Sequence, residues 1–380
     1  MAIKRLDKNQ YEDSLNLSMY AFQYNVPEEE KEKRFRQLDD HELYGIEVKE
    51  ELAAKLHLLS LDVYMGEREF KMGGIAGVAT YPEYRRKGFV KELLTFTLKR
   101  MKEKGQTISM LHPFSIAFYR KYGWELFTTL KKVKVSRSEL KMFDEVPGNV
   151  RRFDKNNYPP VLEEIYRAYA VKYSGMLSRE KQWWKERSIT NLNVAVYYDS
   201  EGEGKGYILY SIKEEKMKVE ELVVLNSEAR SGMWNFICQH DSMLKEVELV
   251  LSPDDPIVFL LDNPKTATEL HPYFMARIVD VKAFLEQFLS SFNEEVSLKI
   301  SDQYAPWNNK VFTITSDGVV IEQDESPNVL EMEVNALVPL FFGNYSAEKL
   351  FEMGLIKGSQ ESISGLKNIR ANPGLFIDFF

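Results

Sequence analysis

The sequence predicts a multidomain protein of mixed α/β and α+β structure, with central β-sheets flanked by helices. The chain has 380 residues, which at about 100–200 residues per domain corresponds to two or three domains. An apolar, glycine-rich segment, Gly74–Thr80, is typical of a buried strand, and a basic turn and an amphipathic helix follow it. The same coarse order of elements returns in the second third of the chain. We therefore expect two related units in tandem and a third, different unit.

The composition is that of a soluble globular protein with substantial cores, since 44% of the residues are hydrophobic and 28% are charged. Against 50 lysine and arginine residues stand 58 aspartate and glutamate residues, which gives a net charge of −8. This acidic balance argues against a nucleic-acid partner, because such a partner requires a basic face. It is compatible with cationic substrates such as amines.

No membrane segment, disulfide or metal site is expected. The first residues hold no apolar signal core, and no apolar run approaches the roughly 20 residues that span a bilayer. The single cysteine, Cys238, permits no disulfide within the chain and fits a reducing compartment. The five histidines lack the spacing of metal ligands. We therefore predict a cytoplasmic protein without a bound metal.

The first unit is predicted to begin with two helices and to continue as strands. Asp7 can cap the first helix, and Pro27 opens the second, whose first turn holds three glutamates. Those acids could line an amine-binding cleft, but a charged outer face is the interpretation we favour. Residues 43–78 alternate in polarity, which predicts strands and a hairpin. Further strand-like residues, 131–135, precede a turn at Pro147-Gly148, where the unit is expected to end.

The turn after the glycine-rich strand has the residues of a phosphate site. Gly88 stands at the mouth of the next helix, where free backbone N–H groups and the helix dipole attract a diphosphate. Arg85, Arg86 and Lys87 add positive charge beside it. A solvated basic turn is the alternative, and these four residues alone would favour it. The strand before them and a tyrosine-containing segment after them favour the phosphate site.

These segments resemble the GNAT acyltransferases. The first signature of that family is a strand, then (Arg/Gln)-x-x-Gly-x-(Gly/Ala), then a helix. It stands here as Arg85–Val90, with Val90 in place of the small residue. The second signature, an apolar strand followed by a helix with Phe-Tyr and then Gly-aromatic, stands as Ile108–Leu111 and Phe118–Trp124. The resemblance implies acetyl-CoA as the cofactor.

The second unit is predicted to repeat the first without its chemistry. Where the first unit has Arg-Arg-Lys-Gly, this unit has Glu228, Ala229 and a lone Arg230. We interpret it as a degenerate copy that no longer holds CoA and builds walls and interfaces. Its expected elements are helices after Pro159-Pro160 and around 182–185, strands at 192–198, 206–212 and 217–224, a helix through Trp234, and a strand at 247–251.

The third unit resembles the sterol-carrier-protein-like fold. Pro339–Phe342 and Leu350-Phe351 are assigned to its core, with a lipid-binding tunnel as the alternative. After a start near Met275–Ile278, its expected elements are a helix at 279–292, strands at 296–300, 311–316 and 319–323, and short helices at 335–342 and 346–353.

The last residues of the chain, Leu375–Phe380, are apolar apart from Asp378, whereas chain ends are commonly frayed and polar. This tail is therefore expected to dock. Docking would place an α-carboxylate in a defined, partly dry location beside Asp378. The alternative is a hydrophobic tail that closes a core and leaves its carboxylate in solvent.

The three-part order resembles the Eis family over essentially the whole chain, and its domains would be 1–147, 148–274 and 275–380. Members of that family acetylate amines of aminoglycosides and sometimes lysine side chains. The resemblance implies that the carboxylate of Phe380 is the general base and Tyr119 the general acid, with Tyr122 as the rival acid. The cofactor contacts that it implies are Val78, Ala79, Thr80, Arg85, Arg86, Lys87, Gly88, Phe89, Val90, Lys91 and Ser115.

The predicted function is direct transfer of an acetyl group from acetyl-CoA to a primary amine of an aminoglycoside, a similar polyamine or a lysine side chain. The alternative is a non-catalytic scaffold or lipid-binding protein with a retained GNAT shell. The intact phosphate turn and Tyr119 argue against that alternative. The resemblance further implies a homo-hexamer with a small cationic substrate and with neither nucleic acid nor membrane as a partner. These residues do not specify which amine is the acceptor.

Overall fold

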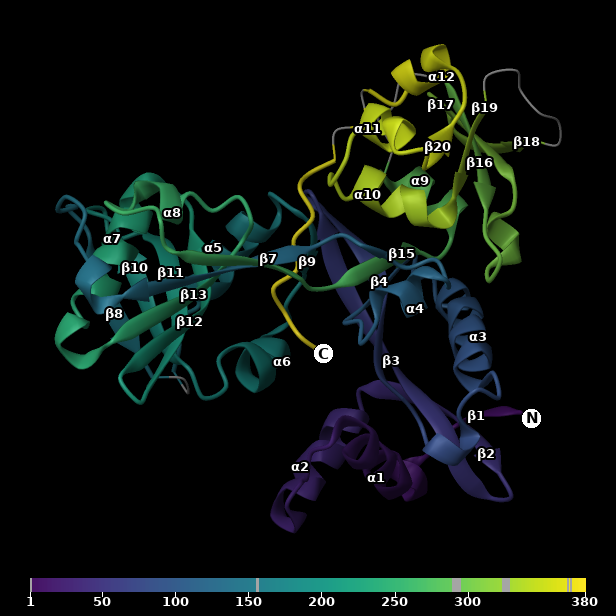
Figure 1. Ribbon diagram of the computed structural model, residues 1–380, viewed down its shortest axis with the longest axis horizontal. Helices are drawn as coiled ribbons and strands as arrows, with labels where there is room; N and C mark the ends of the chain where they lie inside the picture. The colour runs from purple at the N-terminus through teal and green to yellow at the C-terminus, as the bar shows by residue number, and fades with distance from the viewer. Residues whose placement is uncertain (1, 155–156, 289–294, 323–328, 368, 370) are drawn as a thin grey trace.

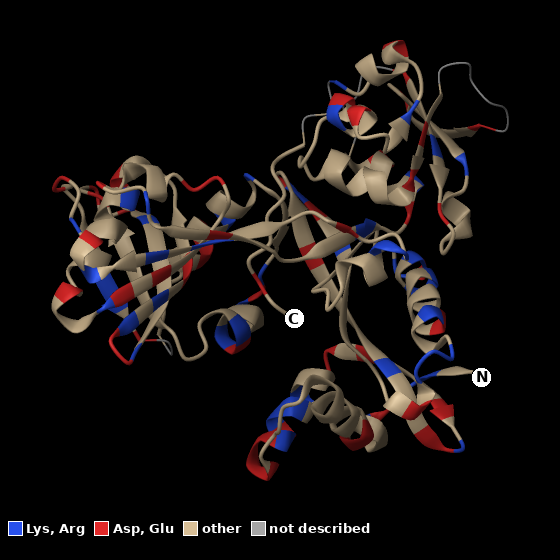
Figure 2. Cartoon of the chain, viewed as in Figure 1, with Lys and Arg blue, Asp and Glu red and all other residues tan. Residues whose placement is uncertain are grey.

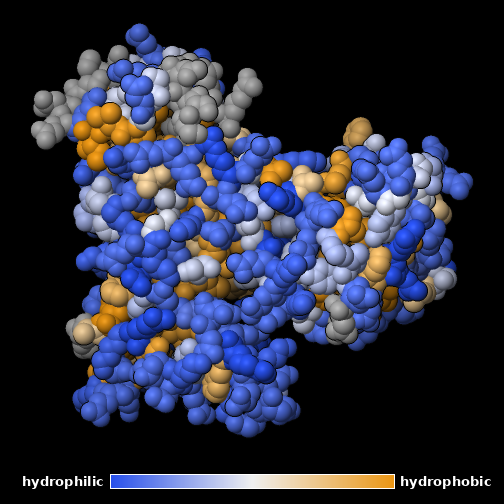
Figure 3. All heavy atoms as spheres, turned by 180° about the vertical axis from the view of Figure 1, so that it is seen from behind, coloured by the Kyte–Doolittle hydropathy of each residue, from blue (hydrophilic) through white to orange (hydrophobic). Residues whose placement is uncertain are grey.

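The computed structural model describes residues 2–154, 157–288, 295–322, 329–367, 369 and 371–380. These residues form three β-sheets, one for each predicted unit, and the C-terminus lies between the first and second units (Figure 1). Seen from behind, most of the surface is hydrophilic and hydrophobic residues form separate patches (Figure 3). Within the described ranges, no helix combines the length and the apolar character that crossing a membrane requires.

The first sheet is built on a long antiparallel hairpin of β3 and β4 that turns at Gly66. Adjacent β3 side chains point to opposite faces, so α3 covers the face of Leu56, and α1 covers the face of Lys55. The sheet order is β1-β2-β3-β4-β5-β15-β6, with β9 beside β3. The strands are β1 (Ile3–Arg5), β2 (His41–Val48), β3 (Glu51–Met65), β4 (Arg68–Thr80), β5 (Ile108–Leu111), β6 (Glu125–Leu126), β9 (Ser174–Leu177) and β15 (Met275–Ile278), and the helices are α1 (Tyr11–Phe22), α2 (Glu28–Leu38), α3 (Phe89–Glu103) and α4 (Ile116–Arg120).

The second sheet repeats the strand–helix–strand order of the first, which confirms the predicted duplication. Strand β12, helix α7 and strand β13 correspond to β4, α3 and β5, and in both units the two strands are parallel. The sheet order is β14-β7-β13-β12-β11-β10-β8. The strands are β7 (Thr129–Ser136), β8 (Asn149–Phe153), β10 (Asn193–Tyr198), β11 (Gly204–Lys213), β12 (Lys216–Val224), β13 (Glu246–Leu251) and β14 (Ala267–Pro272), and the helices are α5 (Val161–Ala170), α6 (Lys181–Trp183), α7 (Ser227–Cys238) and α8 (Ile257–Leu260).

Three strands belong to a different sheet from the one that the sequence predicted. Residues 131–135 were assigned to the first unit, but β7 pairs with β13 and β14 of the second sheet. Met275–Ile278 was expected to open the third unit, but it pairs with β5 and β6 of the first sheet. Strand β9 likewise reaches back to β3. We call this pairing of strands with the sheet of another unit the strand exchange. Alternating polarity identifies a strand but not the strand with which it pairs, so the strand exchange could not be predicted from the sequence.

The third sheet, in the order β18-β17-β16-β19-β20, shares its core with the first. Phe284 and Phe341 pack in one cluster with Met72 of β4, and the predicted core residues Pro339–Phe342 and Leu350 are buried. The predicted residues 289–292 and 323 lie outside the described residues. The strands are β16 (Val296–Ser301), β17 (Val311–Thr315), β18 (Gly318–Glu322), β19 (Val329–Glu333) and β20 (Ile356–Lys357), and the helices are α9 (Val281–Phe288), α10 (Leu337–Phe341), α11 (Ala347–Glu352) and α12 (Gln360–Ser364).

A buried ion pair joins the third unit to the segment that follows α4. The Arg277 guanidinium donates to both carboxylate oxygens of Asp302, at 2.7 and 2.6 Å, and to the backbone oxygen of Tyr122. Gly123 has a φ of 92°, and a Cβ there would meet the Arg277 side chain. Glycine is therefore required in this motif because both the backbone conformation and the neighbouring guanidinium exclude a side chain.

Candidate functional site

Strands β4 and β5 separate and leave one edge of β4 open. The two strands pair in parallel only over Met72–Ile75 and Ile108–Leu111. Strand β4 then continues to Thr80, and Gly77, at a φ of 54°, lies where its register with β3 shifts. Among the described strands, none pairs with residues 76–80 on the β5 side. The backbone groups of this edge are therefore available to an extended ligand, much as a sheet edge accepts a peptide.

A cavity of about 740 Å³, here called the β4 cavity, lies along this open edge. It connects the edge to the basic turn before α3 and to the segment around α4. Predicted cofactor residues make up much of its wall, while Lys87 and Ser115 are not among the residues that line it. The lining residues are Ala21, Phe22, Val78, Ala79, Thr80, Tyr84, Arg85, Arg86, Gly88, Phe89, Val90, Lys91, Phe114, Phe118, Lys121 and Tyr122.

The basic turn has the geometry of an anion site. Gly88 is the N-cap of α3, with a φ of 87°, and the space in which a Cβ would lie is open. No side chain caps the helix, so the first backbone N–H groups of a 15-residue helix point toward the cavity mouth. Arg85 and Arg86 are exposed on its wall, and Lys and Arg continue along α3 (Figure 2). A diphosphate would find both N–H donors and cations here.

Lys87 and Ser115 have partners of their own. The Lys87 ammonium lies 4.9 Å from the centroid of the Tyr84 ring, in a cation–π contact at the edge of the turn. The hydroxyl of Ser115 accepts a hydrogen bond of 3.4 Å from the backbone N–H of Phe118 and so caps α4. Neither residue lines the β4 cavity. A contact between either side chain and the cofactor therefore stays a prediction.

The two candidate tyrosines occupy different environments. Tyr119 is 3% exposed and packs against the rings of Phe114 and Trp124, at centroid distances of 5.5 and 6.4 Å. Burial raises the pKa of its phenol above the usual value. Tyr122 lines the β4 cavity, whereas Tyr119 does not. The sequence argument placed both on one helix, but α4 ends at Arg120 and Tyr122 lies in the turn after it.

The tail, Leu375–Phe380, docks between the first and second units, as its apolar sequence predicts. Leu375 and Phe376 are fully buried. The Phe380 ring lies against β4, where a Cβ on Gly74 would come within 2.8 Å of it. Gly74 is the last β4 position but one before the strand leaves β5. The final residue of the chain therefore lies at the point where β4 and β5 separate.

A buried ionic clamp holds the tail in place. Asp378 accepts hydrogen bonds from Nε of Arg179, at 3.0 and 3.1 Å, and from Nε1 of Trp183, at 2.7 Å. The other guanidinium nitrogens of Arg179 donate to Glu221 at 3.0 and 2.7 Å. Burial raises the pKa of Asp378, and Arg179 opposes that rise. The hydroxyl of Tyr273 donates to the backbone oxygen of Asp378 at 2.9 Å, so both the side chain and the backbone of this residue are fixed.

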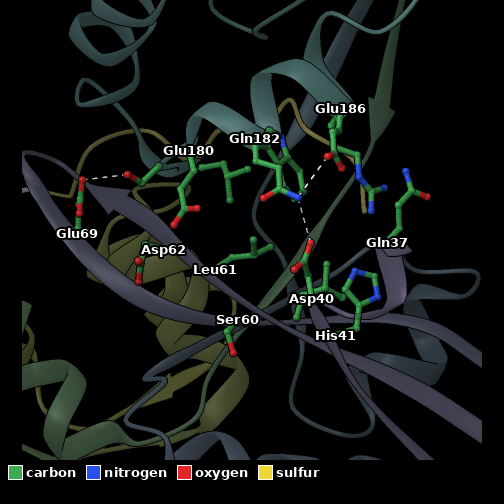
Figure 4. Close-up of a pocket in the computed structure, with 15 residues that line it drawn as sticks. Gln37, Asp40, His41, Ser60, Leu61, Asp62, Glu69, Glu180, Gln182 and Glu186 are labelled. Atoms are coloured by element: carbon green, nitrogen blue, oxygen red, sulfur yellow. Dashed lines mark hydrogen bonds between the residues drawn. The ribbon is translucent and has the colours of Figure 1, made fainter. Parts of the chain in front are cut away.

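A second cavity of about 490 Å³, the acidic pocket, lies along β3 of the same hairpin, with Gln37 of α2 on its wall (Figure 4). Leu59 and Leu61 of β3 are on its wall, and Leu59 pairs with Gly74, against which the Phe380 ring lies. Gln182 donates to Asp40 at 3.4 Å across the pocket and to Glu186 of its own segment at 3.3 Å. The residues that line it are Gln37, Asp40, His41, Leu59, Ser60, Leu61, Asp62, Glu69, Leu177, Ser178, Glu180, Gln182, Trp183, Glu186 and Arg187.

The acidic pocket was missed by the sequence analysis. Its carboxylates come from four separate segments, represented by Asp40, Asp62, Glu69 and Glu180. No short motif joins them, and the three glutamates at the start of α2, which we had considered for such a cleft, are not among its lining residues. The strand exchange that brings the second unit onto β3 assembles this pocket, so a local pattern could not have revealed it.

Comparisons with known proteins agree with this architecture. Residues 2–127 and 175–278 each match a family model described as an acetyltransferase (GNAT) domain, and residues 281–374 match a sterol carrier protein domain. An uncharacterised N-acetyltransferase from Streptomyces avermitilis is 24% identical over 318 residues, which cover 77% of this chain and 76% of that protein. The N-acetyltransferase Eis of Mycobacterium tuberculosis is 26% identical over 236 residues, or 58% of each chain.

Solved structures show the same fold over the full length. A conserved protein from Enterococcus faecalis, described as a candidate N-acyltransferase, superposes with a TM-score of 0.91 at 27% identity and covers 100% of this chain and 99% of its own. Eis1 from Mycobacterium abscessus superposes with a TM-score of 0.81 at 20% identity, with coverage of 100% and 98%. These matches confirm two tandem GNAT folds followed by a sterol-carrier-type domain.

Replacing Arg179 should strongly destabilise the protein. Arg179→Leu leaves the carboxylates of Asp378 and Glu221 buried without a cation, which typically costs about 3–5 kcal/mol. The exposed Arg120–Glu125 pair, with contacts of 2.7 and 2.5 Å, provides the matched control. Arg120→Leu should cost about 1 kcal/mol or less. Urea unfolding followed by tryptophan fluorescence measures both, and equal losses would contradict the role of the clamp.

Proposed function

The chain is an acetyltransferase of the GNAT type, with two GNAT domains and a sterol carrier protein domain, and from this we propose that it transfers acetyl from acetyl-CoA to a primary amine of a small polycationic molecule. An aminoglycoside or a polyamine has the required charge and size, and a lysine side chain is the macromolecular equivalent. The observation that carries the proposal is the placement of two cavities on one hairpin. Val78 lines the β4 cavity, and Leu59, opposite Gly74 a few residues away, lines the acidic pocket.

The β4 cavity would hold acetyl-CoA. The diphosphate would lie at the N-terminus of α3 beside Arg85 and Arg86, and the pantetheine arm would pair with the open edge at Val78–Thr80. A backbone N–H of that edge would then face the acetyl carbonyl oxygen. Such a donor typically lowers the barrier of acyl transfer by about 3 kcal/mol, because negative charge develops on that oxygen in the transition state.

The acidic pocket would hold the amine. Carboxylates on several sides of one pocket attract a molecule with several ammonium groups, whereas a single amine gains less. Burial raises the pKa of Asp62, whereas Asp40, Glu69 and Glu180 are exposed at the rim of the pocket. The acidic pocket and the tail share a wall, since Trp183 lines the pocket and donates to Asp378. An amine bound in the pocket would therefore approach the thioester beside Phe380.

Transfer would be direct. The ammonium that is to react would first lose a proton to solvent; its neutral nitrogen would then attack the thioester carbonyl, a C–N bond would form, and the C–S bond would break. The terminal carboxylate of Phe380 would accept the proton of the amine, directly or through water, and Tyr119 would protonate the departing thiolate. The raised pKa of Tyr119 keeps its phenol protonated before the reaction. Cys238 is unsuited as an acyl carrier because it is buried in the core of the second domain, where burial raises its pKa to about 12.

The proposed oligomeric state and cellular location rest on the same family resemblance. We propose a homo-hexamer in the cytoplasm, and light scattering of the purified protein would test the assembly. The described core of the sterol-carrier-type domain packs with the first sheet, so it offers no observation that favours a lipid-carrying function over amine acetylation.

Acetyl-CoA and a panel of amines test the proposed function directly. Release of free CoA thiol should be fastest with amines that carry three or more charges and at least tenfold slower with butylamine. The cause is the number of carboxylates that the acidic pocket presents to each cation. Hydrolysis without amine supplies the control. A protein that releases no thiol with any amine would be the scaffold of the alternative prediction.

Reversing the charge of Arg86 should weaken the binding of acetyl-CoA. Arg86→Glu places an anion beside the diphosphate, so the KM for acetyl-CoA should rise about tenfold, equivalent to roughly 1.4 kcal/mol, with the KM for the amine nearly unchanged. Arg137→Glu makes the same change on the remote segment after β7 and is the matched control. If Arg86→Glu behaves like Arg137→Glu, the phosphate site is elsewhere.

Moving the terminal carboxylate should slow turnover without loss of CoA binding. Deletion of Phe380, or addition of two alanines after it, should reduce kcat at least tenfold, because the base leaves its place while the clamp on Asp378 stays. Calorimetry with CoA checks that the donor site is intact. An unchanged kcat in the extended protein would exclude the terminal carboxylate as the base.

A further inference from the structure

A buried cluster of basic side chains lies between the two cavities and has no part in the steps above. Lys55 is 0% exposed, and its Nζ lies 2.6 Å from the Ser18 hydroxyl of α1 and 2.7 Å from Nε2 of His57. The His57 ring is 5.5 Å from the ring of His41 on β2. Three titratable bases thus stand in contact inside the first domain.

The position of the cluster connects the acidic pocket to the strand that would carry the thioester. Lys55, His57, Leu59 and Leu61 alternate along β3, so they share one face, and the two leucines line the acidic pocket. His41 lines it as well, and its buried Nδ1 has no hydrogen-bond partner among the described residues. On the other side, the His57 ring lies against β4, where a Cβ on Gly77 would come within 3.2 Å of it.

The surroundings of Lys55 favour a neutral amine. A buried ammonium is costly without a carboxylate, and its polar neighbours are a hydroxyl and an imidazole. Burial lowers the pKa of Lys55 to about 7 and that of His57 well below the usual value. The groups that face the pair are Ser18 from α1 and His41 from β2, and Arg187 acts on His41 from the segment after α6. None of these is an anion that would hold a proton on Lys55.

We propose that His57 and Lys55 form a proton relay that takes up the proton of the attacking amine. The proposal rests on the proposed amine acetylation and adds a proton acceptor to it. Before reaction, Nε2–H of His57 donates to the lone pair of Lys55. When the C–N bond forms, the amine proton passes through the terminal carboxylate or a water to Nδ1 of His57, and the Nε2 proton moves to Lys55.

After the step, the charge balance is complete. Lys55 is an ammonium that donates to the Ser18 hydroxyl and to the now unprotonated Nε2 of His57, so the contacts at 2.6 and 2.7 Å serve both states. The thiolate takes its proton from Tyr119, and both groups return to their resting state through solvent. Lys55 acts through His57 and is a positioning residue for the proton. The terminal carboxylate, with an intrinsic pKa of about 3.5, holds the proton only in passing.

The pH dependence of kcat/KM tests the relay on the unmodified protein. With several amines of different pKa, one inflection should stay near pH 7 for every amine, because it reports the titration of Lys55. The value of kcat/KM should decrease at pH values below this inflection, as Lys55 becomes protonated. Profiles that share no inflection near pH 7 among the amines would overturn the proposal. If the unmodified protein releases no CoA with any amine, the proposed function and the relay both fail.

Variants separate the relay from the proposed function. Lys55→Met and Lys55→Arg should each lower kcat at pH 8 at least tenfold and remove the inflection near pH 7, with CoA affinity within twofold of the unmodified protein. Arginine tests the chemistry because it is permanently charged and cannot accept a proton. Lys134→Met, at an exposed position of β7, is the matched control. An unchanged inflection in either Lys55 variant, with the unmodified protein active, would overturn the relay alone.

Discussion

The buried ion pairs of the Arg179 guanidinium are the interaction on which the arrangement of the three domains depends. It lies in the segment after β9, is 1% exposed, and pairs with Asp378 of the tail and Glu221 of β12. Its face stacks on the rings of Tyr166 and Trp184, at 4.0 and 4.6 Å. Burial of three charges is costly, but bidentate geometry and ring stacking offset it. The result is a tail fixed at its third residue from the end, with the Phe380 ring against β4 and the Phe379 ring against His112 and Phe274.

The strand exchange fixes the position of the segment that carries Arg179. Because β9 pairs with β3, the segment that carries Arg179 and Trp183 is held at the first sheet rather than on a separate domain. Strand β15 returns to β5 and continues into the third domain, whose core merges with that sheet. The acidic pocket and the site of Phe380 are therefore parts of one packed body. A single GNAT domain would have the β4 cavity but neither the pocket wall nor the tail.

The parts of the site that depend on local sequence could be predicted, and those that depend on tertiary pairing could not. The turn around Gly88 and the strand before it form a continuous segment, so the residue types revealed the geometry. The docked tail was visible because five of the last six residues of the chain are apolar. The acidic pocket, by contrast, joins residues as distant as Asp40 and Glu186, and only the partner choice of β9 brings them together. The relation of Tyr119 and Tyr122 to the β4 cavity depends on where α4 ends, which capping alone does not fix.

The central claim is that an acyl donor along β4 and an amine in the acidic pocket meet at Phe380. A crystal structure with CoA joined to a polyamine through a thioether bridge tests it most directly. The account predicts that the pantetheine pairs with Val78–Thr80, that the polyamine lies among the carboxylates of Asp40 and Glu180, and that the bridge passes the Phe380 carboxylate. A polyamine in solvent, or a bridge remote from Phe380 with the CoA part in place, would contradict it.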